Sequence, residues 1–169
     1  MSGSIHVKEI YTIGHGILDE NTFFILLKSH DIKYLIDCRS APYSKKAPQY
    51  NYTRMHNSCR QHGIEYRYLG DLLGGRPTNA ELLDSRGEPD ELKMRRSPAF
   101  VKGITLVKQF AENNNVCILC GEPDPVYCHR YSLIGAELAN EDISLQHIYH
   151  DGQVIPQEEI GPGQQMDLF

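Results

Sequence analysis

The sequence lacks the features that would place the protein in a membrane, in a secretory pathway or directly on nucleic acid. No apolar run approaches the roughly 20 residues that a membrane-spanning helix requires. The first eight residues have neither the basic start nor the apolar stretch of a secretory signal. The formal net charge of −5 gives no overall basic excess for binding nucleic acid. We therefore expect a cytoplasmic protein with no membrane contact, in which any contact with nucleic acid uses a local patch or a partner.

A disulfide framework is not expected either, because the number of cysteines is odd, at five, and no secretory signal accompanies them. Cys117 and Cys120 have the Cys-x-x-Cys spacing of zinc and redox sites. Both, however, belong to an apolar run at residues 116–120 that is typical of a buried strand. Side chains three residues apart on a strand point to opposite faces. We therefore interpret this pair as buried structural cysteines rather than as a chelating pair.

Strand-like and helix-like segments alternate along the chain. This alternation predicts a single α/β domain over residues 1–159, with a largely parallel sheet of about five strands and helices on both faces. Residues 70–97 contain many glycines, prolines and charges, and we expect an irregular connection there that acts as a lid or a mobile segment. The expected strands are residues 9–14, 34–38, 65–69, 116–120 and 144–149, and the expected helices are residues 19–29, 52–62, 98–113 and 128–139.

Three of the expected helix ends are marked by particular residues. Asp19 precedes a segment with an apolar face and can accept hydrogen bonds from the first free N–H groups of a helix. Ser97 is a capping residue followed by Pro98, and proline suits the first helical position. Gly63 predicts the end of the helix before it, since glycine adopts the backbone conformation that closes a helix.

Polar residues follow several of the expected strands at the point where each strand ends. His15 follows the first strand, and Asp37 and Arg39 stand at the end of the second. In an open parallel sheet, ligands gather at the carboxyl ends of the strands. We therefore expect one site, with Arg39 and Arg130 in a single pocket beside Asp37 and Glu122. The predicted catalytic residues are His15, Asp37, Glu122, Cys128 and His129, and the predicted anion-binding residues are Arg39 and Arg130.

Acid–base chemistry on a charged substrate suits these residues. His15, Asp37 and Glu122 would transfer protons. Arg130 stands near an expected helix start, where free N–H groups also attract anions, and Arg39 would face it. The two guanidinium groups would together hold a phosphate or a carboxylate. A purely structural pairing of Asp37 with Arg39 is an equally good interpretation of those two residues.

Several short motifs extend over most of the chain. They are Thr-Ile-Gly-His-Gly at residues 12–16, Ile-Asp-Cys-Arg at 36–39, Leu-Gly-Gly at 73–75, Cys-Gly-Glu at 120–122, Cys-His-Arg at 128–130, His-Ile at 147–148 and Asp-Gly at 151–152. Together they resemble a bacterial and archaeal family, the domain of unknown function 488. The resemblance covers about residues 10–154 and implies a shared fold and a shared site without a settled reaction. Gly16 stands where the family often has serine, so no serine role is expected there.

The last five residues form a separate motif. Gln-Met-Asp-Leu-Phe at residues 165–169 resembles the bacterial sliding-clamp-binding pentapeptide, Gln-Leu-Ser/Asp-Leu-Phe. We expect residues 160–169 to be a flexible tail on a Gly-Pro-Gly tether, rather than an apolar end that folds back on the domain. Leu168 and Phe169 would enter a hydrophobic pocket of the clamp. The predicted clamp-binding residues are Gln165, Met166, Leu168 and Phe169.

These observations favour an enzyme that acts on nucleic acid or nucleotides in DNA repair or maintenance and is recruited through the sliding clamp. Its chemistry would be hydrolase-like, and the sequence requires no cofactor. One alternative is a cysteine-dependent sulfur-transfer or phosphatase-like enzyme in which Cys128 or Cys120 attacks. The Cys-x5-Arg cradle of such phosphatases is absent, because Arg130 follows Cys128 by only two residues.

The sequence leaves two further alternatives open. The protein could be a non-catalytic adaptor of the clamp, with the polar edge of the sheet binding a ligand or a partner. The second alternative is a metal site formed by His15, Cys120, Cys128 and His129. No spacing among these residues is diagnostic of a metal site. We therefore predict no metal ligands from the sequence.

Overall fold

The computed structural model describes residues 9–161, so the predicted clamp-binding residues Gln165, Met166, Leu168 and Phe169 lie outside the described part of the chain. One six-stranded sheet has the order β3-β2-β4-β1-β5-β6. All neighbouring strands are parallel except β5 and β6, which are antiparallel. The strands are β1 (Ile10–Gly14), β2 (Ile32–Asp37), β3 (Glu65–Tyr68), β4 (Asn115–Cys120), β5 (Leu145–Ile148) and β6 (Val154–Pro156).

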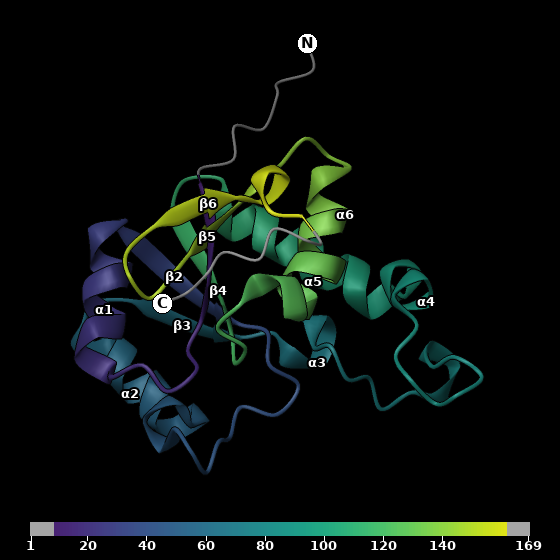
Figure 1. Cartoon of the computed structure of the whole chain (residues 1–169), viewed down its shortest axis with the longest axis horizontal. Helices are drawn as coiled ribbons and strands as arrows, with labels where there is room; N and C mark the ends of the chain where they lie inside the picture. Colours follow the sequence, from purple (N-terminus) through teal and green to yellow (C-terminus); the bar gives the residue numbers. More distant parts are fainter. Residues whose placement is uncertain (1–8, 162–169) are drawn as a thin grey trace.

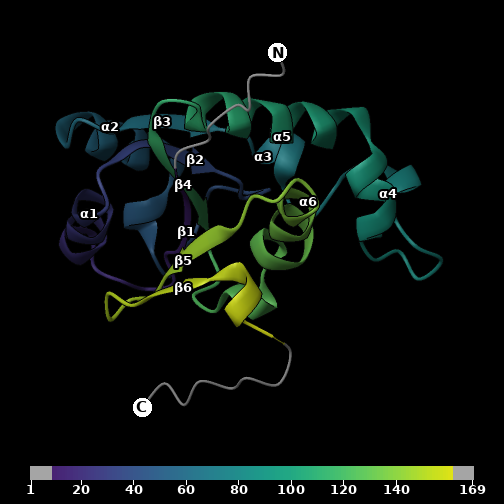
Figure 2. The same cartoon turned by 90° about the horizontal axis from the view of Figure 1, so that it is seen from above.

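Helices cover both faces of this sheet, as expected for the α/β class (Figures 1 and 2). Helices α1 (Glu20–Ser29) and α2 (Tyr52–Gln61) pack on one face. The opposite face carries α3 (Gly70–Leu73), α5 (Pro98–Ala111) and α6 (Ala136–Ala139), with α4 (Glu91–Arg96) at its outer end. Shorter turns are 3-10 helices at Pro48–Tyr50, Ala80–Leu82, Pro125–Tyr127 and Gln157–Glu159, and a π-helix at Arg130–Gly135.

The two faces of the sheet bury two separate apolar clusters, and strand β4 contributes to both. Cys117 and Leu119 pack with α1 and α2, whereas Ile118 and Cys120 pack with α5. The expectation that Cys117 and Cys120 point to opposite faces is therefore confirmed. Because β4 is central and buried on both sides, it anchors the position of the residues that follow Cys120.

The structure differs from the expected elements in three places. A sixth strand, β6, follows the turn at residues 151–152, where only a turn was expected. The segment 70–97 contains α3 and α4, together with a bridge between Leu83 and Pro89, rather than an irregular connection throughout. The helix expected at residues 128–139 is a π-helix that continues into the short α6.

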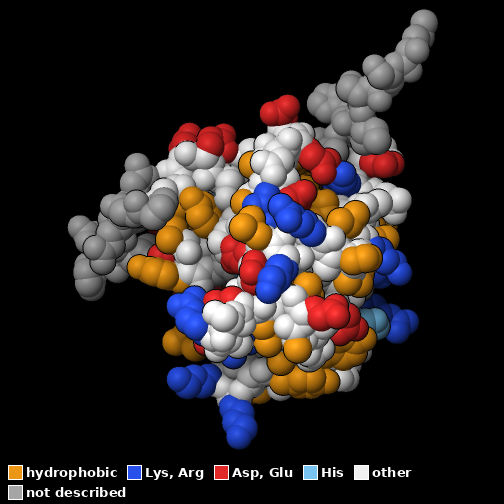
Figure 3. Space-filling view, turned by 90° about the vertical axis from the view of Figure 1, so that its right-hand side faces the viewer, with side chains coloured by type: hydrophobic (Ala, Val, Ile, Leu, Met, Phe, Trp, Pro, Cys, Tyr) orange, Lys and Arg blue, Asp and Glu red, His pale blue; other side chains and the backbone are white. Residues whose placement is uncertain are grey.

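The outer surface on the α4 side has acidic and basic side chains interspersed with apolar ones (Figure 3). Such a mixed surface presents no extended field of one sign to a charged partner. Among residues 9–161, no helix combines the length and the apolar character needed to cross a bilayer.

The helix α5 provides a test of the local signals that set these elements. Ser97 Oγ accepts a hydrogen bond from the backbone N–H of Phe100 at 3.2 Å, as the sequence predicts for a capping residue. Ser97→Ala leaves that N–H without a partner, and we expect the free energy of unfolding to fall by about 1 kcal/mol. Ser97→Asp keeps a hydrogen-bond acceptor at this position, so it should retain most of the wild-type free energy of unfolding. Urea denaturation of the three proteins measures this, and equal midpoints would show that the cap contributes nothing.

Candidate active site

The carboxyl ends of β1, β2 and β4 open into a cleft of about 900 Å³. Residues that follow each of these strands form its wall, because parallel strands end at one edge of the sheet. Five predicted site residues line the cleft, namely His15, Arg39, Glu122, Cys128 and His129. Asp37 and Arg130 do not line it and are fully buried. The cleft therefore contains one of the two guanidinium groups that were expected to share a pocket.

The buried carboxylate of Asp37 is fully engaged by two side chains. Arg39 donates to it from Nε at 2.9 Å and from Nη2 at 2.7 Å, and its backbone N–H donates at 3.1 Å. The Tyr66 hydroxyl donates to Oδ2, and burial raises the pKa of that hydroxyl, which keeps it protonated. Asp37 therefore has no free oxygen with which to accept a proton from a substrate. Its role is to orient Arg39.

His15 is held in a single tautomer by its neighbours. Its Nδ1 donates to the carbonyl of Gly16 at 2.8 Å, so Nε2 carries no proton and accepts from Arg39 Nη1 at 3.2 Å. Its ring stacks on Tyr50 with 4.4 Å between centroids. Burial lowers the pKa of His15 to about 4. The imidazole is therefore neutral at pH 7 and orients the guanidinium of Arg39 at the cleft wall.

The guanidinium of Arg130 binds backbone carbonyls rather than facing the cleft. Nη1 donates to the carbonyl of Glu122 at 2.7 Å, and Nη2 donates to that of Pro123 at 3.0 Å. Nε donates to Thr12 Oγ1 at 3.1 Å, and this hydroxyl is 2.6 Å from Nδ1 of His147. All three sides of the guanidinium are thus occupied by protein groups. Arg130 fixes the loop after β4 against β1, in place of the predicted anion-binding role.

The loop after β4 runs against the end of β1 with no space between them. The N–H of His15 donates to the carbonyl of Cys120, and that of Gly16 donates to the carbonyl of Gly121, each at 2.9 Å. A Cβ added at Gly14 would lie 1.7 Å from the carbonyl oxygen of Glu122. Glycine at this position is therefore required by the close approach of the two backbones, which brings Cys120 and Glu122 to the cleft.

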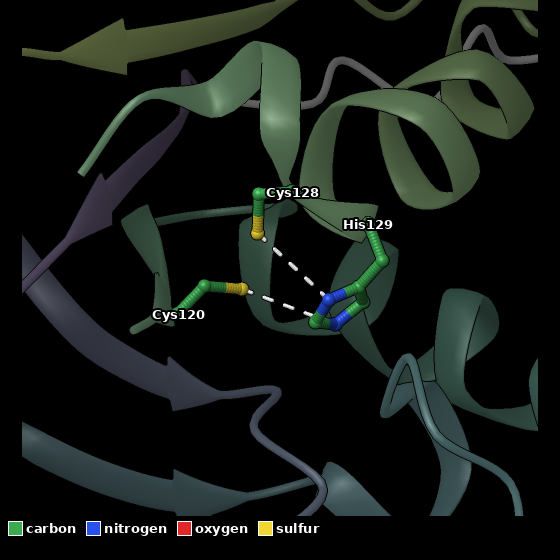
Figure 4. Close-up of side chains that lie close together, drawn as sticks. All are labelled: Cys120, Cys128 and His129. Carbon is green, nitrogen blue, oxygen red and sulfur yellow. Dashed lines mark hydrogen bonds between the residues drawn. The ribbon is translucent and has the colours of Figure 1, made fainter. Parts of the chain in front are cut away.

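Two thiols and an imidazole meet on one wall of the cleft. Both sulfur atoms point toward the ring of His129 (Figure 4), with Cys120 Sγ 3.9 Å from Nε2 and Cys128 Sγ 3.8 Å from Nδ1. Nε2 lies 3.1 Å from the carbonyl oxygen of Cys38. Because a carbonyl can only accept, Nε2 carries a proton and Nδ1 is left to exchange one with the Cys128 sulfur. Gly75 packs closely against the His129 ring.

The two thiols differ sharply in acidity. The pKa of Cys128 is lowered, chiefly because the Cys120 thiol donates a hydrogen bond to its sulfur and also because His129 and Arg130 are close. Burial raises the pKa of Cys120 well above its ordinary value. Cys120 therefore keeps its proton and stabilises a Cys128 thiolate. Cys128 lines the cleft wall and is 7% exposed.

The same atoms could also hold a metal ion. The two sulfur atoms and one ring nitrogen of His129 lie within 4.8 Å of one another. Two thiolates and an imidazole are a donor set that Zn²⁺ and other thiophilic ions accept. His15, which was considered with these three residues from the sequence, is not part of the cluster.

Some residues of the cleft were not among the predicted site residues. Cys120 was interpreted first as structural, and only in the alternatives as a nucleophile or a metal ligand, whereas the structure places it at the end of β4 on the cleft wall. Lys46 and Arg76 line the cleft from two separate connections, and so do the aromatic rings of Tyr43 and Tyr127. Nothing in the local sequence around these four residues links them to one another, since they are brought together only by the fold.

The two buried histidines predict a loss of stability in mild acid. Burial lowers the pKa of His15 and of His147 to about 4, against 6.5 for the free side chain. The unfolded chain therefore binds more protons in this interval. Stability is complete above about pH 6.5 and falls as the pH drops toward 4, by up to about 3 kcal/mol for each histidine.

The measurement is the free energy of unfolding by urea between pH 7.5 and pH 5, a range above that in which ordinary carboxylates titrate. His147→Asn should flatten the decline, even where it lowers stability overall. The exposed His56 provides a control, because His56→Gln should leave the slope unchanged. Identical slopes in the two variants would contradict the account of His147.

Two glycines of the site provide a matched pair. We expect Gly14→Ala to lower the free energy of unfolding by about 1–3 kcal/mol, because the added methyl group must displace the Glu122 carbonyl. A Cβ at Gly121 would meet only His15 Nε2 at 3.5 Å, an ordinary contact, so Gly121→Ala should change stability much less. Thermal melts of both variants measure the difference. Similar melting temperatures would show that the loop yields freely.

Comparison with known proteins identifies the family. The family described as domain of unknown function DUF488 matches residues 20–136, which is more than half of the chain. Searches of curated proteins and of solved structures found no match. The matched segment contains β2, β4 and the π-helix. It therefore includes Arg39, which follows β2, Cys120, which ends β4, and Cys128 and His129, which come directly before the π-helix. The chain belongs to the DUF488 family.

Proposed function

We propose that this protein is an enzyme that acts on a negatively charged substrate by covalent catalysis at Cys128. The observation that carries the proposal is the contact of Cys128 with Cys120 and His129 at the wall of the cleft. A thiolate is the reactive form of cysteine, and this arrangement favours it through a hydrogen-bond donor and a nearby imidazole. The alternative of a cysteine-dependent enzyme thus has more support than acid–base catalysis by Asp37, whose oxygens are occupied.

The roles of the other residues follow from their contacts. In the covalent step, the Cys128 thiol passes its proton to His129 Nδ1, and the sulfur forms a bond to the electrophilic atom of the substrate. The bond between that atom and the leaving group breaks, and the leaving group departs with its electron pair and the proton from Nδ1. Arg39, held by Asp37 and His15, presents the remaining N–H of Nη1 to an anion at the cleft wall. Glu122 is exposed in the cleft and is available for proton transfer with water.

The nature of the anion is supported by the cations around the cleft. Lys46 and Arg76 are exposed there, and neither forms an ion pair within residues 9–161. A phosphate-bearing substrate would satisfy them, which agrees with the expectation of a nucleotide or a nucleic acid. Recruitment by the sliding clamp in DNA repair stays a prediction of the last five residues, which lie outside the described part of the chain.

Alkylation with two small reagents tests the nucleophile and its preference for anions together. Iodoacetate is negatively charged and iodoacetamide is neutral, so the ratio of their rates reports the local charge. We expect Cys128 to react first with both reagents at pH 6, and Lys46→Ala/Arg76→Ala to lower the rate with iodoacetate selectively. Peptide mass spectrometry after timed quenching assigns each rate to its cysteine, on protein treated with a chelator.

Cys59 is the internal control, since it is buried in the α2 cluster and burial raises its pKa to about 12. Modification of Cys128 no faster than that of Cys59 would contradict the proposal. Cys128→Ser should then abolish turnover in a screen of phosphate esters and nucleotides, whereas Cys59→Ser should leave it intact. Turnover by folded Cys128→Ser would show that the protein is an enzyme but would contradict the covalent step at Cys128.

A further inference from the structure

Exposed aromatic and apolar side chains are concentrated at the cleft. In residues 9–161, seven large hydrophobic side chains are exposed, and three of them line this one cleft. Ile17 is 79% exposed, Tyr43 is 68% exposed and Tyr127 is 76% exposed. Rings left in water at the rim of a pocket are typical of a ligand-binding surface, since the ring faces are covered when the ligand binds.

The same rim carries cations that have no acidic partner. Seven ion pairs in the described residues use other lysines and arginines, whereas Lys46 and Arg76 form none there. Glu122 is the one acidic residue in the cleft wall. Two free cations, two aromatic rings and the edge of the Arg39 guanidinium therefore surround the opening. This combination suits a ligand with both phosphates and flat ring systems.

A second, open groove adjoins the cleft at Tyr43. Its volume is about 700 Å³, and Tyr43 is part of both walls. The groove is lined largely by amide and hydroxyl side chains on and just before α2. The exposed ones, Thr53, Asn57 and Gln61, offer donors and acceptors to the edges of bases. Its one acidic residue, Glu20, is paired with Arg54. The polar lining residues are Asn51, Thr53, Asn57, Ser58 and Gln61.

We propose that the cleft and this groove form one binding surface for single-stranded nucleic acid. Tyr43 and Tyr127 stack on bases, Lys46 and Arg76 contact phosphates, and the strand passes Tyr43 into the groove. The inference rests on the proposed function and names the substrate class of the same site. A mononucleotide would occupy only the cleft. Because Tyr43 is part of the wall of both the cleft and the groove, we favour a longer strand that extends into the groove.

The acidic charge of the whole chain sets the expected strength of binding. Because only two free cations contact phosphates, the slope of log K against log salt should be shallow, about −1.4 at ~0.7 per phosphate on a single strand. The base stacking contributes the remainder, and loss of one stacked ring should weaken binding about 5- to 100-fold. Binding of this kind depends on both the rings and the local charges, unlike attraction to a general basic surface.

Fluorescence anisotropy with a labelled oligothymidylate of about 12 nucleotides, a length within the usual site sizes, tests the proposal on the full-length protein. We expect saturable binding at low salt with the shallow slope given above. Tyr43→Ala and Tyr127→Ala should each weaken binding, and Tyr43→Phe, which keeps the ring, should restore most of it. Lys46→Ala/Arg76→Ala should reduce the slope to near zero. Leu92→Ala, at an exposed apolar residue of α4, is the matched control and should bind as the wild type does.

Three results would overturn the inference. These are no binding at low salt, equal binding by wild type and the Tyr43→Ala/Tyr127→Ala variant, and equal binding of an abasic oligonucleotide or of an acidic peptide of matched charge. The proposed covalent function is tested separately by alkylation of Cys128. If the oligonucleotide binds but Cys128 is unreactive, the binding surface is supported and covalent catalysis at Cys128 is contradicted. If Cys128 is reactive but no oligonucleotide binds, covalent catalysis is supported and the binding surface is contradicted.

Discussion

The site depends on one buried interaction, the binding of the Arg130 guanidinium to the backbone after β4. Arg130 is fully buried, and it donates to the carbonyls of Glu122 and Pro123 and to the Thr12 hydroxyl of β1. Hydrogen bonds from a charged donor to buried carbonyls are among the stronger ones in proteins. Because Arg130 comes two residues after Cys128, this contact also holds Cys128 beside Cys120. Strand β4 holds Cys120, and Arg130 holds the loop that follows it, so that the two thiols meet.

Much of the fold could be predicted from the sequence, because its signals are local. The alternation of segments, the caps at Asp19 and Ser97, and the opposite orientation of Cys117 and Cys120 each depend on a few adjacent residues. Strand β6 has only three residues and pairs with β5 alone, so it leaves little periodicity to detect. The π-helix was missed because its sequence has the same apolar spacing as an α-helix of that length.

The site was predicted less completely, because the sequence places polar residues at one edge without showing their partners. His15 and Arg39 line the cleft as expected. Asp37 instead accepts hydrogen bonds from Arg39 and Tyr66, and Arg130 donates to backbone carbonyls, so neither is free to bind a substrate. The closeness of Cys120 to His129 depends on where β4 ends, which a run of apolar residues does not reveal. Lys46, Arg76 and the rim tyrosines come from separate connections, and only the folded chain brings them together.

The central claim is that Cys128 is a thiolate at neutral pH and that Cys120 holds it in that state. Titration of the ultraviolet thiolate absorbance, on protein freed of metal, tests this most directly. The account predicts a one-thiolate transition well below pH 7 in the wild type, its loss in Cys128→Ser, and its shift to higher pH in Cys120→Ser, because the donated hydrogen bond is gone. A first transition only above about pH 8, where an ordinary thiol ionises, would contradict the account, as would an acidic transition that persists in Cys128→Ser.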